Sequence, residues 1–275
     1  SCCCCGRPVS SLAGGRALFD LCAARPEPIP FFGELGSVNP MFLLPHAVKA
    51  RGEAIAKGWA GSLTMGAGQF CTNPGIAVVI DSPEAGAFVD FAVAAVGPTP
   101  AQVMLTDGIA AAYRSGRDRI RETAGVREVL TSTCDLRNAT PYLFVTSGAD
   151  WLGNHVLGEE VFGPLGLIVV AKDAGEMREI AASMQGQLTA TLHLDAGDTE
   201  LAQGLMPILE RKAGRVLANG YPTGVEVADA MVHGGPYPAS TNFGATSVGT
   251  MSIRRFLRPV CYQNMPEALL PEDLR

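Results

Sequence analysis

Short, strongly apolar runs alternate with amphipathic segments along the second half of the chain, and this alternation limits the possible folds more than any other feature. The clearest run, at 165–171, carries no charge and is far too short to cross a bilayer. A run of this kind predicts a strand that is buried on both faces. Because buried strands that alternate with helices are typical of a parallel sheet, we expect an α/β fold.

The individual elements follow from the same patterns together with proline, glycine and capping residues. The expected strands are residues 76–80, 142–145, 165–171, 188–194, 215–218 and 252–263, with an extended segment at 29–35. The expected helices are residues 14–25, 47–62, a segment opened by Pro83, 107–124, 173–185 and 198–212. Asp173 and Asp198 are the expected N-caps of the last two helices. The segment 220–249 is long for a connection, and such loops are often functional.

Composition excludes several classes of protein. The 275 residues are 47% hydrophobic and 17% charged, which is typical of a globular chain. The formal net charge of −6, with scattered Lys and Arg, argues against a nucleic-acid-binding face, and no run is long enough for a membrane span. The N-terminus lacks a signal-peptide pattern, and the cysteines after residue 5 are scattered as in reduced enzymes. We therefore expect a cytoplasmic protein with no nucleic-acid or membrane partner.

The first ten residues contain a run of four cysteines, from Cys2 to Cys5. Neighbouring thiols cannot build a regular disulfide framework, and zinc ligands are usually spaced by two or more residues so that they can converge. Residues 1–10 are therefore interpreted as a non-native or low-complexity leader. A metal-binding tail formed by chance is the alternative.

Two residues suggest acyl chemistry. Cys71 follows Gly66 and Gly68, which leave room for a substrate, although a lone cysteine is more often a small buried hydrophobe. Glu34 is a surface carboxylate or a helix cap in the simplest interpretation, but its apolar neighbours are expected to desolvate it and favour its neutral form. A thiolate attacks a carbonyl carbon and a carboxylate activates water, which are the two groups that oxidation through a thioester requires.

The order and spacing of several motifs resemble the catalytic half of an aldehyde dehydrogenase. The motifs are GELG at 33–36, MGAGQFC at 65–71 and EEVFGP at 159–164. The segment 12–20 resembles the last helix of the coenzyme domain in that family. The ending is more specific, because MVHGGPYP at 231–238, TSVGT at 246–250 and the segment 255–263 resemble one branch, the α-ketoglutaric semialdehyde (2,5-dioxovalerate) dehydrogenases. The resemblance runs from about Ser11 to the C-terminus.

The resemblance implies a role for each motif residue. Cys71 is the nucleophile and Glu34 deprotonates the hydrolytic water. Glu160 accepts hydrogen bonds from the nicotinamide ribose hydroxyls, which suits an ionised carboxylate because it is acceptor-only. Phe162 packs beside the nicotinamide ring, and Ser11 contacts the cofactor pyrophosphate at the start of a helix. The implied cofactor is NADP or NAD, the implied substrate an acidic semialdehyde and the implied product 2-oxoglutarate.

The resemblance also implies a domain organisation. Residues 1–10 are the leader, 11–33 a remnant of the coenzyme-binding domain, 34–250 the catalytic domain and 251–275 a C-terminal strand and oligomerisation segment. The expected fold is thus the parallel-sheet aldehyde dehydrogenase catalytic domain, with most of the Rossmann-type coenzyme domain absent. The family's oxyanion-binding asparagine and adenine-side lysine lie upstream of Ser11. The full-length parent is expected to be a homo-oligomer.

The histidines give little support to other kinds of site. None of the four clusters in sequence with Cys or Asp, so neither a Ser-His-Asp hydrolase nor a metal site is expected. His233 opens a His-Gly-Gly-Pro loop and, with Ser240 and Thr241, is a candidate for the mouth of the substrate site. Two alternatives stay open: a non-catalytic remnant that only packs against a partner, and hydrolysis of a thioester or ester by Cys71 and Glu34 without cofactor.

Overall fold

The computed structural model describes residues 12–134 and 136–275, and within them a seven-stranded sheet dominates. The strand order is β4-β6-β7-β2-β1-β8-β9, and every neighbouring pair is parallel except β4 and β6. The strands are β1 (Met41–Leu43), β2 (Ile76–Ile80), β4 (Val126–Leu130), β6 (Tyr142–Ser147), β7 (Leu165–Ala171), β8 (Gln187–His193) and β9 (Ala213–Ala218). The expected α/β fold with a parallel sheet is confirmed.

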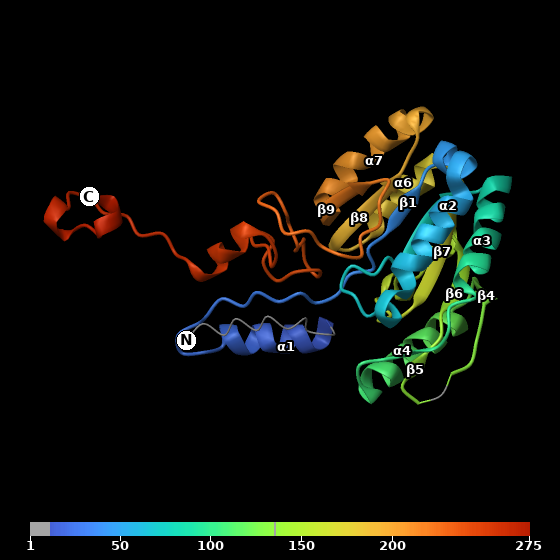
Figure 1. Ribbon diagram of the computed structural model, residues 1–275, viewed down its shortest axis with the longest axis horizontal. Coiled ribbons are helices and arrows are strands. Elements are labelled where there is room, and N and C mark those ends of the chain that lie inside the picture. Colours follow the sequence, from blue (N-terminus) through green and yellow to red (C-terminus); the bar gives the residue numbers. More distant parts are fainter. Residues whose placement is uncertain (1–11, 135) are drawn as a thin grey trace.

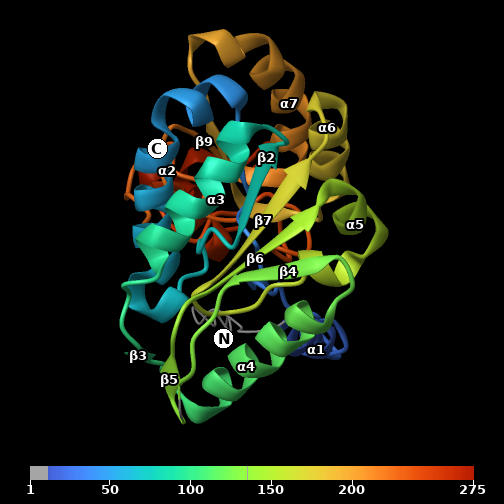
Figure 2. The ribbon, with the colours of Figure 1, turned by 90° about the vertical axis from the view of Figure 1, so that its right-hand side faces the viewer.

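Helices cover both faces of this sheet. The helices are α1 (Leu12–Ala23), α2 (Pro45–Thr64), α3 (Pro83–Val96), α4 (Asp107–Glu122), α5 (Gly148–Gly153), α6 (Ala174–Ser183) and α7 (Thr199–Lys212). Figures 1 and 2 show α2 and α3 on one side of the strands and α6 on the other, and Figure 1 places α7 beside α6. A small antiparallel ladder of β3 (Gln102–Val103) and β5 (Asn138–Ala139) lies near α4.

The period-two alternation of strand side chains divides the core into two layers. In β1, Met41 and Leu43 pack in the layer with α2 and α3, whereas Phe42 packs in the layer with α6 and α7. The fully buried Trp59 of α2 stacks on Phe88 of α3 at 6.0 Å between ring centroids, and its Nε1 donates to the Pro74 carbonyl at 2.7 Å. The sheet and the helices on its two faces thus share two closely packed apolar layers.

The capping predictions have different outcomes. Asp173 accepts a hydrogen bond from the Glu176 N–H and caps α6 as expected. Asp198 stands at the N-cap position of α7, but its side chain makes no capping bond there. Its carboxylate accepts instead from the main-chain N–H groups of His46 at 2.9 Å and Ala47 at 3.0 Å, so it caps the start of α2. That tertiary partner has no signal in the local sequence.

The predicted strand at 252–263 is wrong. The segment contains a 3₁₀ helix, η4 (Thr250–Phe256), followed by irregular chain, and it pairs with no strand among the described residues. Figure 1 shows the residues after η4 extending away from the sheet, on the same side as α1. Because a strand is stabilised by a neighbouring strand, apolar residues alone do not form one here. No helix in the described ranges is long and apolar enough to cross a membrane.

Candidate active site

The predicted catalytic and cofactor-binding residues of the described chain lie on loops at the amino-terminal ends of the parallel strands. Glu34 lies shortly before β1, Cys71 shortly before β2 and Glu160 shortly before β7. Ligand sites in open α/β sheets usually lie beyond the carboxyl ends of the strands. Here the functional groups lie on the loops that lead into the strands.

The segment that carries Glu34 is anchored to the loop that follows β9. Glu34 and Ser240 form an isolated antiparallel bridge, and the Leu35 N–H donates to the Ala239 carbonyl at 3.1 Å. The hydroxyl of Thr241 accepts from the Gly33 N–H at 2.9 Å. The Thr241 hydroxyl is therefore hydrogen-bonded to main-chain groups. The Ser240 hydroxyl is hydrogen-bonded to the main chain of Asn242 in its own loop. The location of Ser240 and Thr241 at a substrate mouth stays a prediction.

Two buried polar side chains fix the same segment to the sheet and to the cysteine loop. Oε1 of Gln187, the first residue of β8, accepts from Ser37 Oγ at 2.8 Å, Val38 N at 2.8 Å and Asn39 N at 3.0 Å. The Asn39 amide in turn donates to the Cys71 carbonyl at 2.9 Å. These residues position the base relative to the nucleophile. The sequence patterns did not single them out, because neither stands beside a catalytic residue in the chain.

Glycines allow the loops to approach one another closely. Gly68 has a φ of +66°, and a Cβ there would lie 2.3 Å from the carbonyl carbon of Gly163. The cysteine loop therefore packs against the Phe162-Gly163-Pro164 turn. A Cβ on Gly235 would lie 2.2 Å from the carbonyl oxygen of Gln187, so the His-Gly-Gly-Pro loop rests directly on the start of β8. No larger residue fits at either position without a backbone shift.

The His-Gly-Gly-Pro loop brings His233 between the two predicted catalytic residues. His233 Nε2 lies 3.3 Å from Cys71 Sγ and 3.3 Å from Glu34 Oε2, and the His233 side chain is only 6% exposed. Ser247 Oγ donates to the other carboxylate oxygen of Glu34 at 2.5 Å. His233 and Cys71 are 162 residues apart, so their spacing in sequence gave no sign of this cluster.

The cluster changes the protonation expected for Glu34. Burial acts to raise the pKa of this carboxyl, but the contacts with His233 and Ser247 outweigh it, and the pKa lies below its ordinary value. The expected neutral form of Glu34 is therefore wrong, because the apolar neighbours act together with a close cation. Burial likewise opposes the charge of His233, but its contacts with Cys71 and Glu34 prevail and raise its pKa to about 9.

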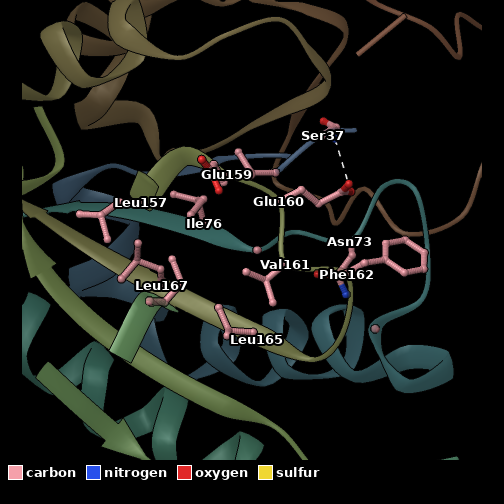
Figure 3. Close-up of a pocket in the computed structure, with 14 residues that line it drawn as sticks. Ser37, Asn73, Ile76, Leu157, Glu159, Glu160, Val161, Phe162, Leu165 and Leu167 are labelled. Atoms are coloured by element: carbon pink, nitrogen blue, oxygen red, sulfur yellow. Dashed lines mark hydrogen bonds between the residues drawn. The ribbon is translucent and has the colours of Figure 1, made fainter. Parts of the chain in front are cut away.

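Glu160 and Phe162 line a separate cleft next to this cluster. The cleft has a volume of about 680 Å³, and its walls include Leu35, Ser37 and Trp151, whereas none of the three clustered residues lines it. Figure 3 shows the Glu160 carboxylate directed to Ser37, whose N–H is 3.4 Å from Oε1. Burial raises the pKa of Glu160 to about 7.

The features of this cleft fit a cofactor carrying ribose hydroxyls. Glu160 accepts only one long hydrogen bond from the described residues, so its oxygens have spare acceptor capacity. The cleft volume lies in the usual range for small-molecule sites, about 300–1,000 Å³. Ser11, the predicted pyrophosphate contact, lies outside the described residues, as does the leader at 1–10.

Comparison with known proteins shows which superfamily the chain belongs to. A search against models of protein families finds no match. The sequence is 51% identical over 270 residues to "Alpha-ketoglutaric semialdehyde dehydrogenase 2" of Azospirillum brasilense, and 45% identical over 268 residues to the "Alpha-ketoglutaric semialdehyde dehydrogenase" of Acinetobacter baylyi. The chain belongs to the aldehyde dehydrogenase superfamily. Each match covers 96% of this chain and 51% of the relative, so the chain spans about half the length of these curated relatives.

Solved structures of the superfamily share the fold. An NAD-dependent aldehyde dehydrogenase from Sinorhizobium meliloti has a TM-score of 0.71 at 19% identity, over 90% of this chain and 48% of its own. The glyceraldehyde-3-phosphate dehydrogenase GapN of Methanocaldococcus jannaschii, solved with NADP, has a TM-score of 0.68 at 20% identity, over 84% and 48%. At such identities the likeness concerns the fold alone.

Proposed function

We propose that this chain is the part of an NAD(P)-dependent aldehyde dehydrogenase that carries the nucleophile and the general base. The convergence of Glu34, Cys71 and His233 beside the Glu160 cleft carries the proposal. A thiol, a carboxylate and a cofactor-sized cleft at one edge of the sheet are the parts that oxidation through a thioester needs.

In the proposed reaction the Cys71 sulfur attacks the aldehyde carbon and later carries the acyl group. His233 holds a positive charge 3.3 Å from that sulfur at neutral pH, which stabilises negative charge on the attacking atom. When bound, the nicotinamide cofactor supplies the hydride acceptor. Glu34 stays ionised at neutral pH because its pKa is lowered, so it is ready to take a proton from the hydrolytic water.

The proposed roles of Glu160 and Phe162 concern binding. The Glu160 carboxylate accepts hydrogen bonds from the ribose hydroxyls, and Phe162 provides an apolar surface for the nicotinamide ring. Both NAD and NADP are kept as candidates, since related folds are described with each. The proposed substrate is an acidic semialdehyde, 2,5-dioxovalerate, on the strength of the two curated relatives. We also propose a cytoplasmic location and a homo-oligomeric assembly for the full-length protein.

The test uses the full-length protein that contains this sequence. Formation of NADH or NADPH is followed with 2,5-dioxovalerate and compared with Cys71→Ala and, as a matched control, Cys261→Ala at an exposed position. We expect turnover that Cys71→Ala abolishes and Cys261→Ala preserves. Turnover that survives Cys71→Ala would refute the assignment of the nucleophile.

A second candidate function, hydrolysis of an ester or thioester without cofactor, is favoured by one observation. Cys71 Sγ lies 3.3 Å from His233 Nε2, close enough for the imidazole to take the thiol proton, and Glu34 Oε2 contacts the same ring nitrogen at 3.3 Å. The measurement is release of p-nitrophenol from an activated ester by the 275-residue chain. A rate that is unchanged in His233→Ala would exclude this candidate.

A further inference from the structure

Three different metal-binding atoms converge at the catalytic cluster. Cys71 Sγ lies 3.3 Å from His233 Nε2, which lies 3.3 Å from Glu34 Oε2, and all three ligand atoms lie within 4.8 Å of one another. Their residues come from three loops that are far apart in the sequence. A thiolate, an imidazole and a carboxylate are the protein ligands that Zn²⁺ uses.

The separations match those of a tetrahedral zinc centre. Zn–S bonds of about 2.3 Å and Zn–N and Zn–O bonds of about 2.0–2.1 Å place sulfur and nitrogen about 3.5 Å apart, and nitrogen and oxygen about 3.3 Å apart. The observed 3.3 Å separations therefore need little change. The sulfur and the carboxylate oxygen lie within 4.8 Å of each other, close enough for both to bind one ion. Mg²⁺ and Ca²⁺ are disfavoured, because both prefer oxygen ligands throughout.

The surroundings hold the ligands as outer-shell groups do in zinc sites. Ser247 Oγ donates to Glu34 Oε1, which leaves Oε2 directed to His233. The His233 main chain is fixed on both sides, since its N–H donates to Thr246 Oγ1 at 2.8 Å and its carbonyl accepts from the Ser247 N–H at 2.8 Å. The Ser247 bond to the carboxylate is the kind of outer-shell partner that orients a metal ligand, and the main-chain bonds hold the loop that carries His233 in place.

We propose that Glu34, Cys71 and His233 bind one Zn²⁺ ion, with water as the fourth ligand. On binding, the thiol proton and any proton on Nε2 leave to solvent, and the ion replaces the contacts that His233 now makes with the other two side chains. The ion occupies the nucleophile and the base at once. Zinc therefore inhibits the site reversibly, a consequence that rests on the proposed dehydrogenase function, whereas the binding itself does not.

The binding test needs neither substrate nor cofactor. Because Cys2 to Cys5 also carry thiols, the titration uses a chain with these four cysteines changed to serine. Isothermal titration with zinc chloride is expected to give one ion per chain and a dissociation constant of about 1 µM or lower. Glu34→Gln, Cys71→Ser and His233→Gln are each expected to weaken binding by at least about 100-fold, and the matched control Cys261→Ser to leave it unchanged.

Two results would overturn the proposal. One is the absence of stoichiometric binding, and the other is an affinity that survives His233→Gln or Glu34→Gln in a folded variant. A second measurement needs no variant at the site: zinc should slow iodoacetamide labelling of Cys71 and spare that of Cys261, and equal labelling with and without zinc refutes the site. If zinc binds in this way and the full-length protein oxidises no aldehyde, the proposed function fails while the metal site stands.

Discussion

Glu160→Gln is expected to stabilise the chain, and only at neutral or alkaline pH. Burial raises the pKa of Glu160 from 4.5 to about 7, so the folded chain holds a proton that the unfolded chain has lost between those values. The unfolded state therefore binds fewer protons, and the free energy of unfolding falls as pH rises from about 4.5 to about 7. An amide of the same shape has no proton to lose.

The magnitude follows from the size of the shift. A shift from 4.5 to about 7 corresponds to at most about 3.5 kcal/mol, at about 1.4 kcal/mol per pH unit. Because the residue as a whole is only partly buried, we expect about 1–3 kcal/mol. The substituted chain should exceed the wild type by this amount at about pH 8 and by little at about pH 4.5.

Urea unfolding followed by circular dichroism at a series of pH values measures the difference. The control is Glu159→Gln, which removes an exposed carboxylate paired with Arg119 at 3.0 Å and should change stability by no more than about 1 kcal/mol at any pH. Other titrating groups are common to all three chains, so their effects cancel in the comparison. A gain for Glu160→Gln that is the same at low and high pH would refute burial as the cause.

Three further predictions concern the cluster and its supports. Cys71 should be labelled by iodoacetamide before Cys134 and Cys261, because among these three cysteines it alone has an imidazole 3.3 Å from its sulfur; peptide mass mapping that finds either of the others labelled first counts against it. In the full-length protein, Glu34→Gln should keep a rapid burst of reduced cofactor and lose steady turnover, since an amide cannot accept the proton of the attacking water; equal loss of both phases would contradict the role as base. Gln187→Ala should lower the free energy of unfolding by at least about 2 kcal/mol, because it leaves the main-chain N–H groups of Val38 and Asn39 without their buried acceptor, whereas the exposed control Gln185→Ala should have little effect in the same urea experiment.

Local signals predicted the strands with a sustained apolar or alternating pattern and missed those that are very short or interrupted by charged residues. The run at 165–171 is β7 over the same residues, because burial on both faces leaves no polar position in the pattern. β4 escaped prediction because Arg127 and Glu128 interrupt it at the antiparallel edge of the sheet. β1 has only three residues, too few for a periodic signal. At 252–263 the apolar residues form no strand, because none of the described strands lies beside them.

Local patterns likewise predicted some residues of the site and missed others. The motifs around Glu34, Cys71 and Glu160 were recognisable because each is a short run with a distinctive composition. The position of His233 depends on Gly235 resting against the Gln187 carbonyl, a contact that no local pattern contains. The predicted direction of the Glu34 pKa shift was wrong for the same reason, because the shift depends on His233, which lies 199 residues later in the chain. Fold class follows from local patterns, whereas the electrostatics of a site follows from its tertiary contacts.

The location of the cluster at the amino-terminal ends of the strands separates stability from function in a testable way. The apolar core fixes the strands, but the loops that carry Glu34 and Cys71 are held by polar side chains, notably Gln187 and Asn39. Loss of core volume therefore weakens the whole chain while the loops keep their relative positions in the molecules that remain folded. Loss of a polar contact moves the base relative to the nucleophile, and a displacement of about 1 Å can lower a catalytic rate about 100-fold. Substitutions at Gln187 or Asn39 should consequently reduce catalysis more than their cost in stability accounts for.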